Sequence, residues 1–207
     1  VGVKKMKYKS SLLFDSRIDK DIHKSKKLIQ HFYGAEIIFE DEVVNEDEVV
    51  LMDLQDNKKD FNFIYILPYS KKKVLIETTY FSDKVLTLPD YKKDLEEYIS
   101  KNYFGKKYKI MNLESGIIPM FKFKEENTYN YIKIGTAGNW VKQSTGYSLQ
   151  NSFTFSRQLV DCIIKGKKPQ IKKRMVYDFL DNTFCKFALK NPRGLILFFE
   201  KFFMYNN

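Results

Sequence analysis

The stretch of sequence that decides the fold class reads Ile-Gly-Thr-Ala-Gly-Asn-Trp-Val-Lys-Gln-Ser-Thr-Gly over residues 134–146. It follows a short apolar run, Tyr131–Ile134, and precedes a segment from about Tyr147 to Lys165 that has the spacing of a helix. Small residues between a strand and a helix let a phosphate or the edge of an anionic ring approach backbone N–H groups at the positive end of the helix dipole. Such junctions are also common as plain tight connections, so the spacing alone leaves both interpretations open.

Upstream of this passage the chain consists mainly of short runs rich in Ile, Val, Tyr and Phe, which are typical of β-strands. They predict an antiparallel sheet made from Ser10–Phe14, Leu28–Phe39, Glu48–Leu54, Phe61–Pro68, Val74–Phe81 and Lys109–Met120. Both alternating sets of residues in Phe61–Leu67 are mostly apolar, so this strand is expected to be covered on both faces. Lys71–Lys73 is expected to form the turn of a hairpin with the strand that follows.

Helices are predicted between and after these strands from apolar residues at helical spacing. The predicted helices are Leu88–Asn102, Tyr147–Lys165, Lys172–Lys190 and the phenylalanine-rich Gly194–Tyr205. Proline and glycine in Pro192–Gly194 predict a break between the last two.

The composition fits a globular protein with a basic surface. A length of 207 residues with 43% hydrophobic residues suits one domain or part of a larger one, and it excludes a collagen-like, coiled-coil or disordered chain. The net charge of +10 predicts an anionic partner, either nucleic acid or the surface of an anionic bilayer. Two cysteines and two histidines form neither a disulfide framework nor a metal-ligand cluster, and no apolar run is long enough to span a membrane.

The charge alternates along the chain. Residues 1–31 carry +6, residues 32–60 carry −8 and residues 61–207 carry +12. A nucleic-acid-binding module more usually has one continuous basic face, so the alternation argues against nucleic acid as the partner. The densest basic run, 165–174, lies near the phenylalanine-rich segment 194–205, a combination that fits contact with a membrane surface. A solvated linker and a helix docked on the protein body are the alternatives.

The residues of 134–147 closely resemble the second flavin-binding passage of the lycopene cyclases, flavoproteins that close the ends of linear carotenoids into rings. Further blocks resemble the same family in the family's order: Phe14–Arg17, Leu28–Gly34, Met52–Gln55, Phe63–Ser70, Leu75–Ser82 and Gly116–Met120. Together they cover most of residues 12–160, and the C-terminal helical region is the least distinctive part.

The resemblance implies an incomplete flavoprotein fold of the p-hydroxybenzoate-hydroxylase-like type, α+β or α/β in class, with an antiparallel or mixed substrate-domain sheet followed by C-terminal helices. In that family a G-x-G-x-x-G motif near the N-terminus holds the FAD pyrophosphate, and this sequence contains no such motif. The chain is therefore expected to be the C-terminal two thirds of a cyclase, which by itself neither binds FAD tightly nor turns over. The expected division is a substrate domain at 1–130, the second FAD-binding passage and its helix at 131–165, and a helical region at 166–207 that is a candidate membrane contact.

Glu77 matches the position of the family's acid and is the residue that the resemblance assigns to catalysis. Cyclisation begins with protonation of a carbon–carbon double bond, so the enzyme needs a carboxyl group that is still neutral in the cytoplasm. Burial among Ile66, Leu75 and Ile76 would raise the pKa of Glu77 in that direction. Alternation puts Glu77 on one face with Leu75 and Thr79, which leaves a solvent-facing carboxylate as the alternative.

Asp53 is the second candidate catalytic carboxylate, with a strand-end hydrogen-bond acceptor as the alternative role. For FAD binding the resemblance points to small residues of the glycine-rich passage, namely Gly135, Thr136, Ala137, Gly138, Thr145 and Gly146. Two departures from the family pattern bear on the site. Thr78 stands where many relatives have a second acid, and Asn139 replaces a glycine beside the flavin.

The function implied by the resemblance is that of a lycopene cyclase of the β-ring type, an isomerase of carotenoid biosynthesis. It would use reduced FAD without net redox change, with NAD(P)H as the electron source. Lycopene or a related linear carotenoid is dissolved in the bilayer, so the protein is expected in the cytoplasm at the membrane periphery, without nucleic acid as a partner. The alternatives are an FAD-dependent oxidoreductase or monooxygenase of the same superfamily and a basic nucleic-acid-binding module. The choice of β or ε rings, the number of ends closed and the oligomeric state stay open.

Overall fold

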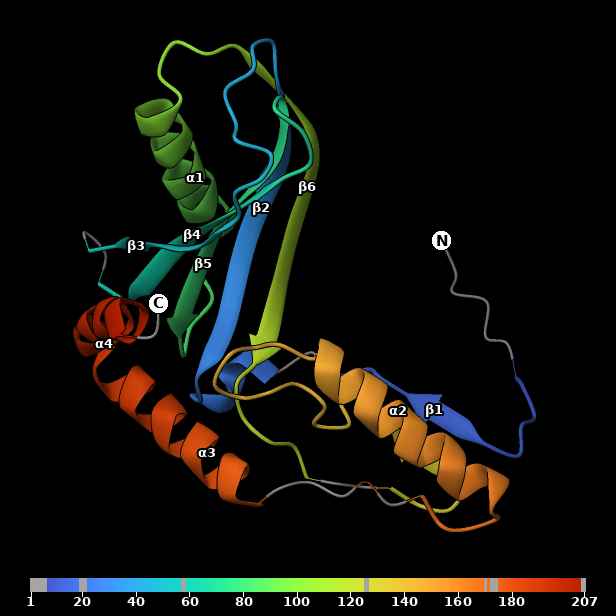
Figure 1. Cartoon of the computed structure of the whole chain (residues 1–207). Coiled ribbons are helices and arrows are strands. Elements are labelled where there is room, and N and C mark those ends of the chain that lie inside the picture. The colour runs from blue at the N-terminus through green and yellow to red at the C-terminus, as the bar shows by residue number, and fades with distance from the viewer. Residues whose placement is uncertain are drawn as a thin grey trace.

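The main body of the protein is a five-stranded antiparallel sheet with helices on both faces (Figure 1). The computed structural model describes residues 7–18, 22–56, 59–124, 127–169, 171 and 175–205. The strand order is β3-β4-β5-β2-β6. The strands are β2 (Ile29–Phe39), β3 (Val50–Gln55), β4 (Phe61–Pro68), β5 (Lys73–Ser82) and β6 (Tyr108–Pro119).

A smaller unit lies at one end of this sheet (Figure 1). In it β1 (Leu13–Asp15) pairs in parallel with β7 (Tyr131–Lys133). The helices are α1 (Leu88–Asn102), α2 (Leu149–Ile164), α3 (Met175–Lys190) and α4 (Pro192–Tyr205), together with the 3₁₀ helix η1 (Ile22–Ser25). Ile132 and Trp140 pack with Phe155 and Leu159 of α2, and this apolar cluster fixes α2 beside the glycine-rich passage.

The strands and helices agree closely with those predicted, including the hairpin between β4 and β5, with one exception. The first predicted strand does not join the main sheet. It pairs instead with β7, which lies far along the chain and runs parallel to it. The predicted break between the last two helices falls at Asn191, and Pro192–Gly194 forms the first turn of α4. Proline tolerates the first helical position, and the Asn191 side chain accepts a hydrogen bond from the Gly194 amide at 3.0 Å. Residues 172–174 of the predicted third helix lie outside the described residues, and the division at residues 130 and 165 stays a prediction.

One face of the sheet is covered by α1. Thr87 and Asp90 form a capping box that starts this helix, and Tyr91, Leu95 and Ile99 recur every four residues on its buried side. They pack against apolar side chains of the strands, among them Tyr33, Ala35, Ile37, Phe39, Ile64, Ile66, Val74 and Ile76. This cluster is the larger core of the protein.

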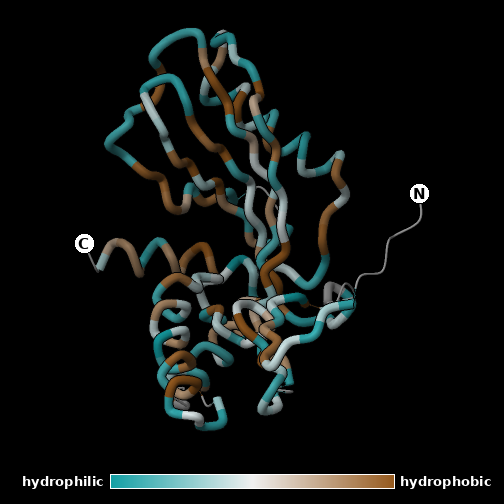
Figure 2. The backbone as a smooth tube through the Cα atoms, turned by 90° about the vertical axis from the view of Figure 1, so that its right-hand side faces the viewer, coloured by the Kyte–Doolittle hydropathy of each residue, from teal (hydrophilic) through white to brown (hydrophobic). Residues whose placement is uncertain are grey.

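The opposite face is covered at one end by α3 and α4 (Figure 1). Phe61, Phe63 and Phe81 pack there against Leu195 and other residues of the two helices. Apolar residues recur along the strands and along these helices (Figure 2). The prediction that β4 is covered on both faces is therefore correct for the half that begins at Phe61, whereas Tyr65 and Leu67 further along it are only half-buried. In the described part of the chain, no helix is both long and apolar enough to cross a membrane.

Candidate functional site

Glu77 lies in the middle of β5, on the face opposite α1. Antiparallel pairing aligns Tyr65 of β4, Glu77 of β5, Gly34 of β2 and Glu114 of β6 in one row across four strands. Residues directly opposite one another in such a row project from the same face of the sheet. Glu77 and Glu114 are thus separated only by Gly34, which has no side chain to stand between them.

The environment of Glu77 keeps a proton on its carboxyl group near neutral pH. Burial raises the pKa of Glu77 to about 7, and the neighbouring Glu114 carboxyl acts in the same direction. The Thr79 hydroxyl donates a hydrogen bond to Glu77 Oε1 at 2.6 Å, which opposes the rise. The direction of the shift agrees with the sequence prediction, although Ile66 and Ile76 belong to the α1 core and do not bury this carboxyl group.

Asp53 and Thr78, the two other polar positions singled out from the sequence, lie on the α1 face. Asp53 pairs with Ile64 and accepts a hydrogen bond from the Tyr98 hydroxyl of α1 at 2.6 Å. Asp53 therefore ties α1 to β3, on the face of the sheet opposite the Glu77 side chain. Thr78 is fully buried and accepts a hydrogen bond from Asn62 Nδ2 at 3.0 Å. A second acid at position 78 would face the α1 core and not the Glu77 carboxyl.

The glycine-rich passage forms a tight turn directly after β7. The amides of Gly138 and Trp140 donate to Ile134 O and Gly135 O, each at 3.0 Å. Gly135 has a φ of +55°, and a Cβ on Gly138 would lie 2.5 Å from Lys133 O, so both positions need glycine for the turn itself. The amides of Thr136 and Ala137 donate no hydrogen bond to any group in the described residues. They remain available to an anionic ligand.

Asn139 belongs to the same turn, at a left-handed φ of +58° that asparagine tolerates. Its side chain bonds the main chain of Phe123, accepting from the amide at 2.7 Å and donating to the carbonyl at 3.0 Å. The departure from the family's glycine therefore holds the segment after β6 against the turn.

The end of the passage meets the sheet on the Glu77 face. Gly146 has a φ of +73°, and a Cβ there would lie 2.2 Å from Gln30 Oε1. Gln30 pairs with Phe81 of β5, so its side chain projects from the same face as Glu77. Gln30 Oε1 is itself buried without a hydrogen-bond partner in the described part of the chain. Tyr65 belongs to the Glu77 row, and burial is the main cause that raises the pKa of its phenol. The second cause is the Tyr147 phenol, which directly follows Gly146 in the chain. The end of the passage thus lies close to this face of the sheet.

Helix α3 holds the passage through contacts that the sequence analysis missed. Lys142 Nζ and Ser144 Oγ both donate to Asp181 Oδ1, each at 2.7 Å, and Asp181 is only 8% exposed. Cys185 Sγ donates to Gln143 O at 3.4 Å. No local pattern points to Asp181 because its partners lie about forty residues earlier in the chain.

Replacement of Asp181 by alanine is expected to lower the free energy of unfolding by about 1–2 kcal/mol, because it removes two hydrogen bonds to a buried carboxylate. Urea denaturation measures this change. The matched control is Glu97→Ala, which breaks the exposed Lys93–Glu97 ion pair of α1 and should cost less than about 0.5 kcal/mol. Equal effects of the two variants would contradict the role of Asp181 as a tie between α3 and the passage.

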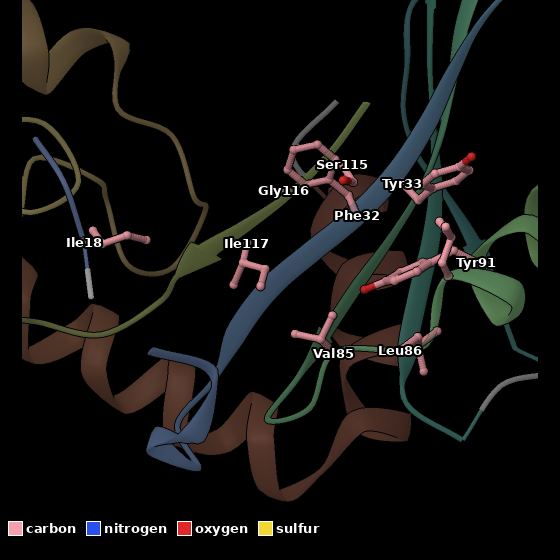
Figure 3. Close-up of a pocket in the computed structure, with 10 residues that line it drawn as sticks. Ile18, Phe32, Tyr33, Val85, Leu86, Tyr91, Ser115, Gly116 and Ile117 are labelled. Carbon is pink, nitrogen blue, oxygen red and sulfur yellow. The ribbon is translucent and has the colours of Figure 1, made fainter. Parts of the chain in front are cut away.

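Two of the cavities bear on the candidate site. One, of about 720 Å³, is lined by Thr136 and Lys142 of the passage, Gln150 and Asn151 of α2, and Asp181 of α3. Its volume is in the range of ligand pockets, and both Thr136 and the first turn of α2 line it. The other, of about 520 Å³, is apolar and is drawn in Figure 3.

Most of the residues that line the apolar cavity lie on the α1 side of the sheet. Tyr33, Leu86, Tyr91 and Ile117 line it, and Tyr33 and Tyr91 also belong to the α1 core (Figure 3). Glu77 is not among the lining residues, since its side chain projects from the other face. The structure thus brings Glu77 together with Glu114 and the end of the glycine-rich passage, but not with Asp53.

Comparisons with known proteins agree with this architecture. A search of curated protein sequences gives no match. The crystal structure of a geranylgeranyl bacteriochlorophyll reductase-like protein from Thermoplasma acidophilum is similar with a TM-score of 0.52 and 13% identity, covering 81% of this chain and 41% of that one. This chain thus spans less than half the length of that protein. The likeness shows a shared fold and confirms the predicted fold class, a mixed α/β protein with an antiparallel sheet and C-terminal helices.

The family model described as "Lycopene cyclase protein" matches residues 4–200. Those residues include both the Glu77 row and the glycine-rich passage. Because the match covers nearly the whole sequence, the chain belongs to the lycopene cyclase family.

Proposed function

We propose that the protein is a lycopene cyclase that closes the ends of lycopene, or of a related linear carotenoid, into β-rings. The observation that carries the proposal is a protonatable carboxyl group, Glu77, on the sheet face that the glycine-rich passage contacts. Membership of the lycopene cyclase family supports a carotenoid substrate and an enzymatic role.

Glu77 acts as the general acid. Its carboxyl proton passes to a terminal carbon–carbon double bond, and the resulting tertiary carbocation is attacked by a neighbouring double bond of the same chain, which closes the ring. Loss of one proton from a ring carbon then completes the reaction, so the product is an isomer of the substrate. Glu77 can supply the first proton because its pKa, raised by burial, keeps the neutral form populated near pH 7.

The glycine-rich passage would hold FAD, and its geometry fits this group. The Thr136 and Ala137 amides make no hydrogen bond within the described residues, and the first turn of α2 lines the same cavity as Thr136, so these N–H groups would be the ones offered to an anionic ligand. Gly135, Gly138 and Gly146 hold the turn in the shape that presents these amides, and Thr145 lies beside Gly146 at its end. Bound in its reduced form, with NAD(P)H as electron source, FAD would supply a negative, polarisable ring that stabilises the carbocation without being consumed.

The rate of cyclisation is expected to fall as the pH rises through about 7, because the protonated Glu77 is the active form and burial raises its pKa to about 7. At higher pH, kcat/KM should decrease about tenfold per pH unit. The measurement is ring formation from lycopene in vesicles by the full-length protein, with FAD reduced beforehand so that flavin reduction does not limit the rate. A rate that stays constant or rises over this range would contradict Glu77 as the acid.

The same assay separates the proposal from its alternatives. An FAD-dependent oxidoreductase or monooxygenase would consume NAD(P)H in proportion to the substrate converted, whereas a cyclase turns over repeatedly on flavin reduced once. A nucleic-acid-binding module would instead show salt-dependent retention on nucleic acid and no ring formation.

The protein also binds the membrane peripherally, from the cytoplasmic side. The carotenoid is an oil-soluble hydrocarbon, so the enzyme has to reach the bilayer. Helix α4 exposes Phe202, Met204 and Tyr205, and α3 exposes Phe179 and Leu180. Exposed apolar side chains of this kind, together with the basic run 165–174 that precedes α3 in the sequence, support interfacial binding.

A further inference from the structure

We propose that Glu114 is a positioning residue that holds the transferable proton on Glu77. This inference rests on the proposed function, since it assigns a second residue to the same proton transfer. Glu114 is not among the residues that the sequence analysis selected, although it lies two positions before the family block that begins at Gly116.

The geometry of the sheet brings the two carboxyl groups together. Glu77 and Glu114 occupy the same row and face, on strands that flank β2. Adjacent strands lie about 4.8 Å apart, so the two backbones are about 10 Å apart, which two extended glutamate side chains can bridge. Gly34 occupies the position between them, and a Cβ there would lie 3.2 Å from the Glu77 Cβ. The absence of a side chain at Gly34 therefore opens the direct path between the carboxyls.

The different exposure of the two groups decides which of them keeps the proton. Glu114 is exposed on the edge strand β6, where water solvates a negative charge, whereas Glu77 is half-buried between β4 and β2. Two neighbouring carboxyl groups resist simultaneous ionisation. The proton shared by the pair therefore stays on Glu77, the less solvated of the two groups.

The other polar and charged groups around Glu77 do not replace this effect. Lys73, the cation on the same face of β5, forms an ion pair with Glu36 of β2 at 2.9 Å. Tyr65 of β4 faces Glu77 from the other side, and burial raises the pKa of its phenol, so it stays neutral. Among the described residues, no ion pair involves Glu77. Glu114 is thus the charged group that acts on it directly.

The test is the Glu114→Gln variant of the full-length protein, which keeps the shape of the side chain and removes its charge. The titration of Glu77 is followed by carbon-13 NMR of labelled glutamate carboxyls, with the Glu77→Gln variant to assign the resonance. The titration midpoint of Glu77 is expected to fall by about one pH unit. The alkaline limb of the cyclisation profile should move down by the same amount, and Glu114→Asp should restore part of the shift.

The matched control is Glu97→Gln, which removes an exposed carboxylate of α1, on the other side of the sheet, and should leave the midpoint of Glu77 in place. If the wild-type protein forms rings and Glu114→Gln changes neither the midpoint nor the profile, the inference is overturned while the proposed function stands. If the wild-type protein forms no rings, the proposed function fails, and the NMR midpoint still decides whether Glu114 holds the proton.

Discussion

The Glu77→Gln variant is expected to lose about three orders of magnitude in the rate of lycopene cyclisation, the middle of the range for removal of a general acid. The amide has nearly the same shape as the carboxyl group but has no acidic proton to give to a double bond. The measurement is ring formation from lycopene by the full-length protein with reduced FAD, compared with the wild type below the pKa of Glu77, where the native acid is fully protonated.

Loss of activity in this variant should not come from loss of folding. A carboxyl group whose pKa is raised in the folded state contributes stability at low pH, and this contribution is lost as the pH rises through its folded pKa, here about 7. The uncharged amide does not suffer that loss, so the free energy of unfolding of Glu77→Gln should exceed that of the wild type above pH 7. FAD affinity should be unchanged. Cyclisation at the wild-type rate would show that another group supplies the proton.

The Gly138→Ala variant is expected to weaken FAD binding by about 10- to 100-fold. The added Cβ would lie 2.5 Å from Lys133 O and 2.8 Å from Ile134 Cα. Both are backbone atoms at the end of β7, so they cannot move aside as a flexible side chain would. The turn has to open, which displaces the amides of Thr136 and Ala137. Flavin fluorescence quenching during titration of the full-length protein measures the affinity.

A glycine far from the passage provides the control. Gly105, in the connection between α1 and β6, has a φ of +71° and no atom within 4 Å of an added Cβ. Gly105→Ala should therefore cost about 1 kcal/mol of stability from left-handed backbone strain and leave FAD affinity unchanged. If Gly138→Ala binds FAD as tightly as the wild type, the passage does not hold the cofactor.

Much of the candidate site follows from local patterns in the sequence. Alternation along β5 places Leu75, Glu77 and Thr79 on one face, as predicted, because successive side chains of a strand point to opposite faces. The hairpin and the glycine-rich turn also depend on residues close together in the chain. Such features are predictable because each is decided by the backbone preferences of a few neighbouring residues.

Features that depend on the register between strands were not predictable in this way. The pairing of β3 with β4 is irregular between Val50 and Asp53, so counting along β3 does not assign the face of Asp53. The parallel pairing of β1 with β7 joins segments more than a hundred residues apart, and neither segment carries a mark of its partner.

The sequence by itself determined the fold class, the order of the strands and helices and the family, and it singled out Glu77 as the proposed acid. Only the tertiary structure placed Asp53 on the opposite face, brought Glu114 to Glu77 across Gly34, and tied the glycine-rich passage to Asp181 of α3. The physical reason is that local periodicity assigns a residue to a face of its own strand or helix. Which faces then meet depends on register and packing between segments that are distant in the chain.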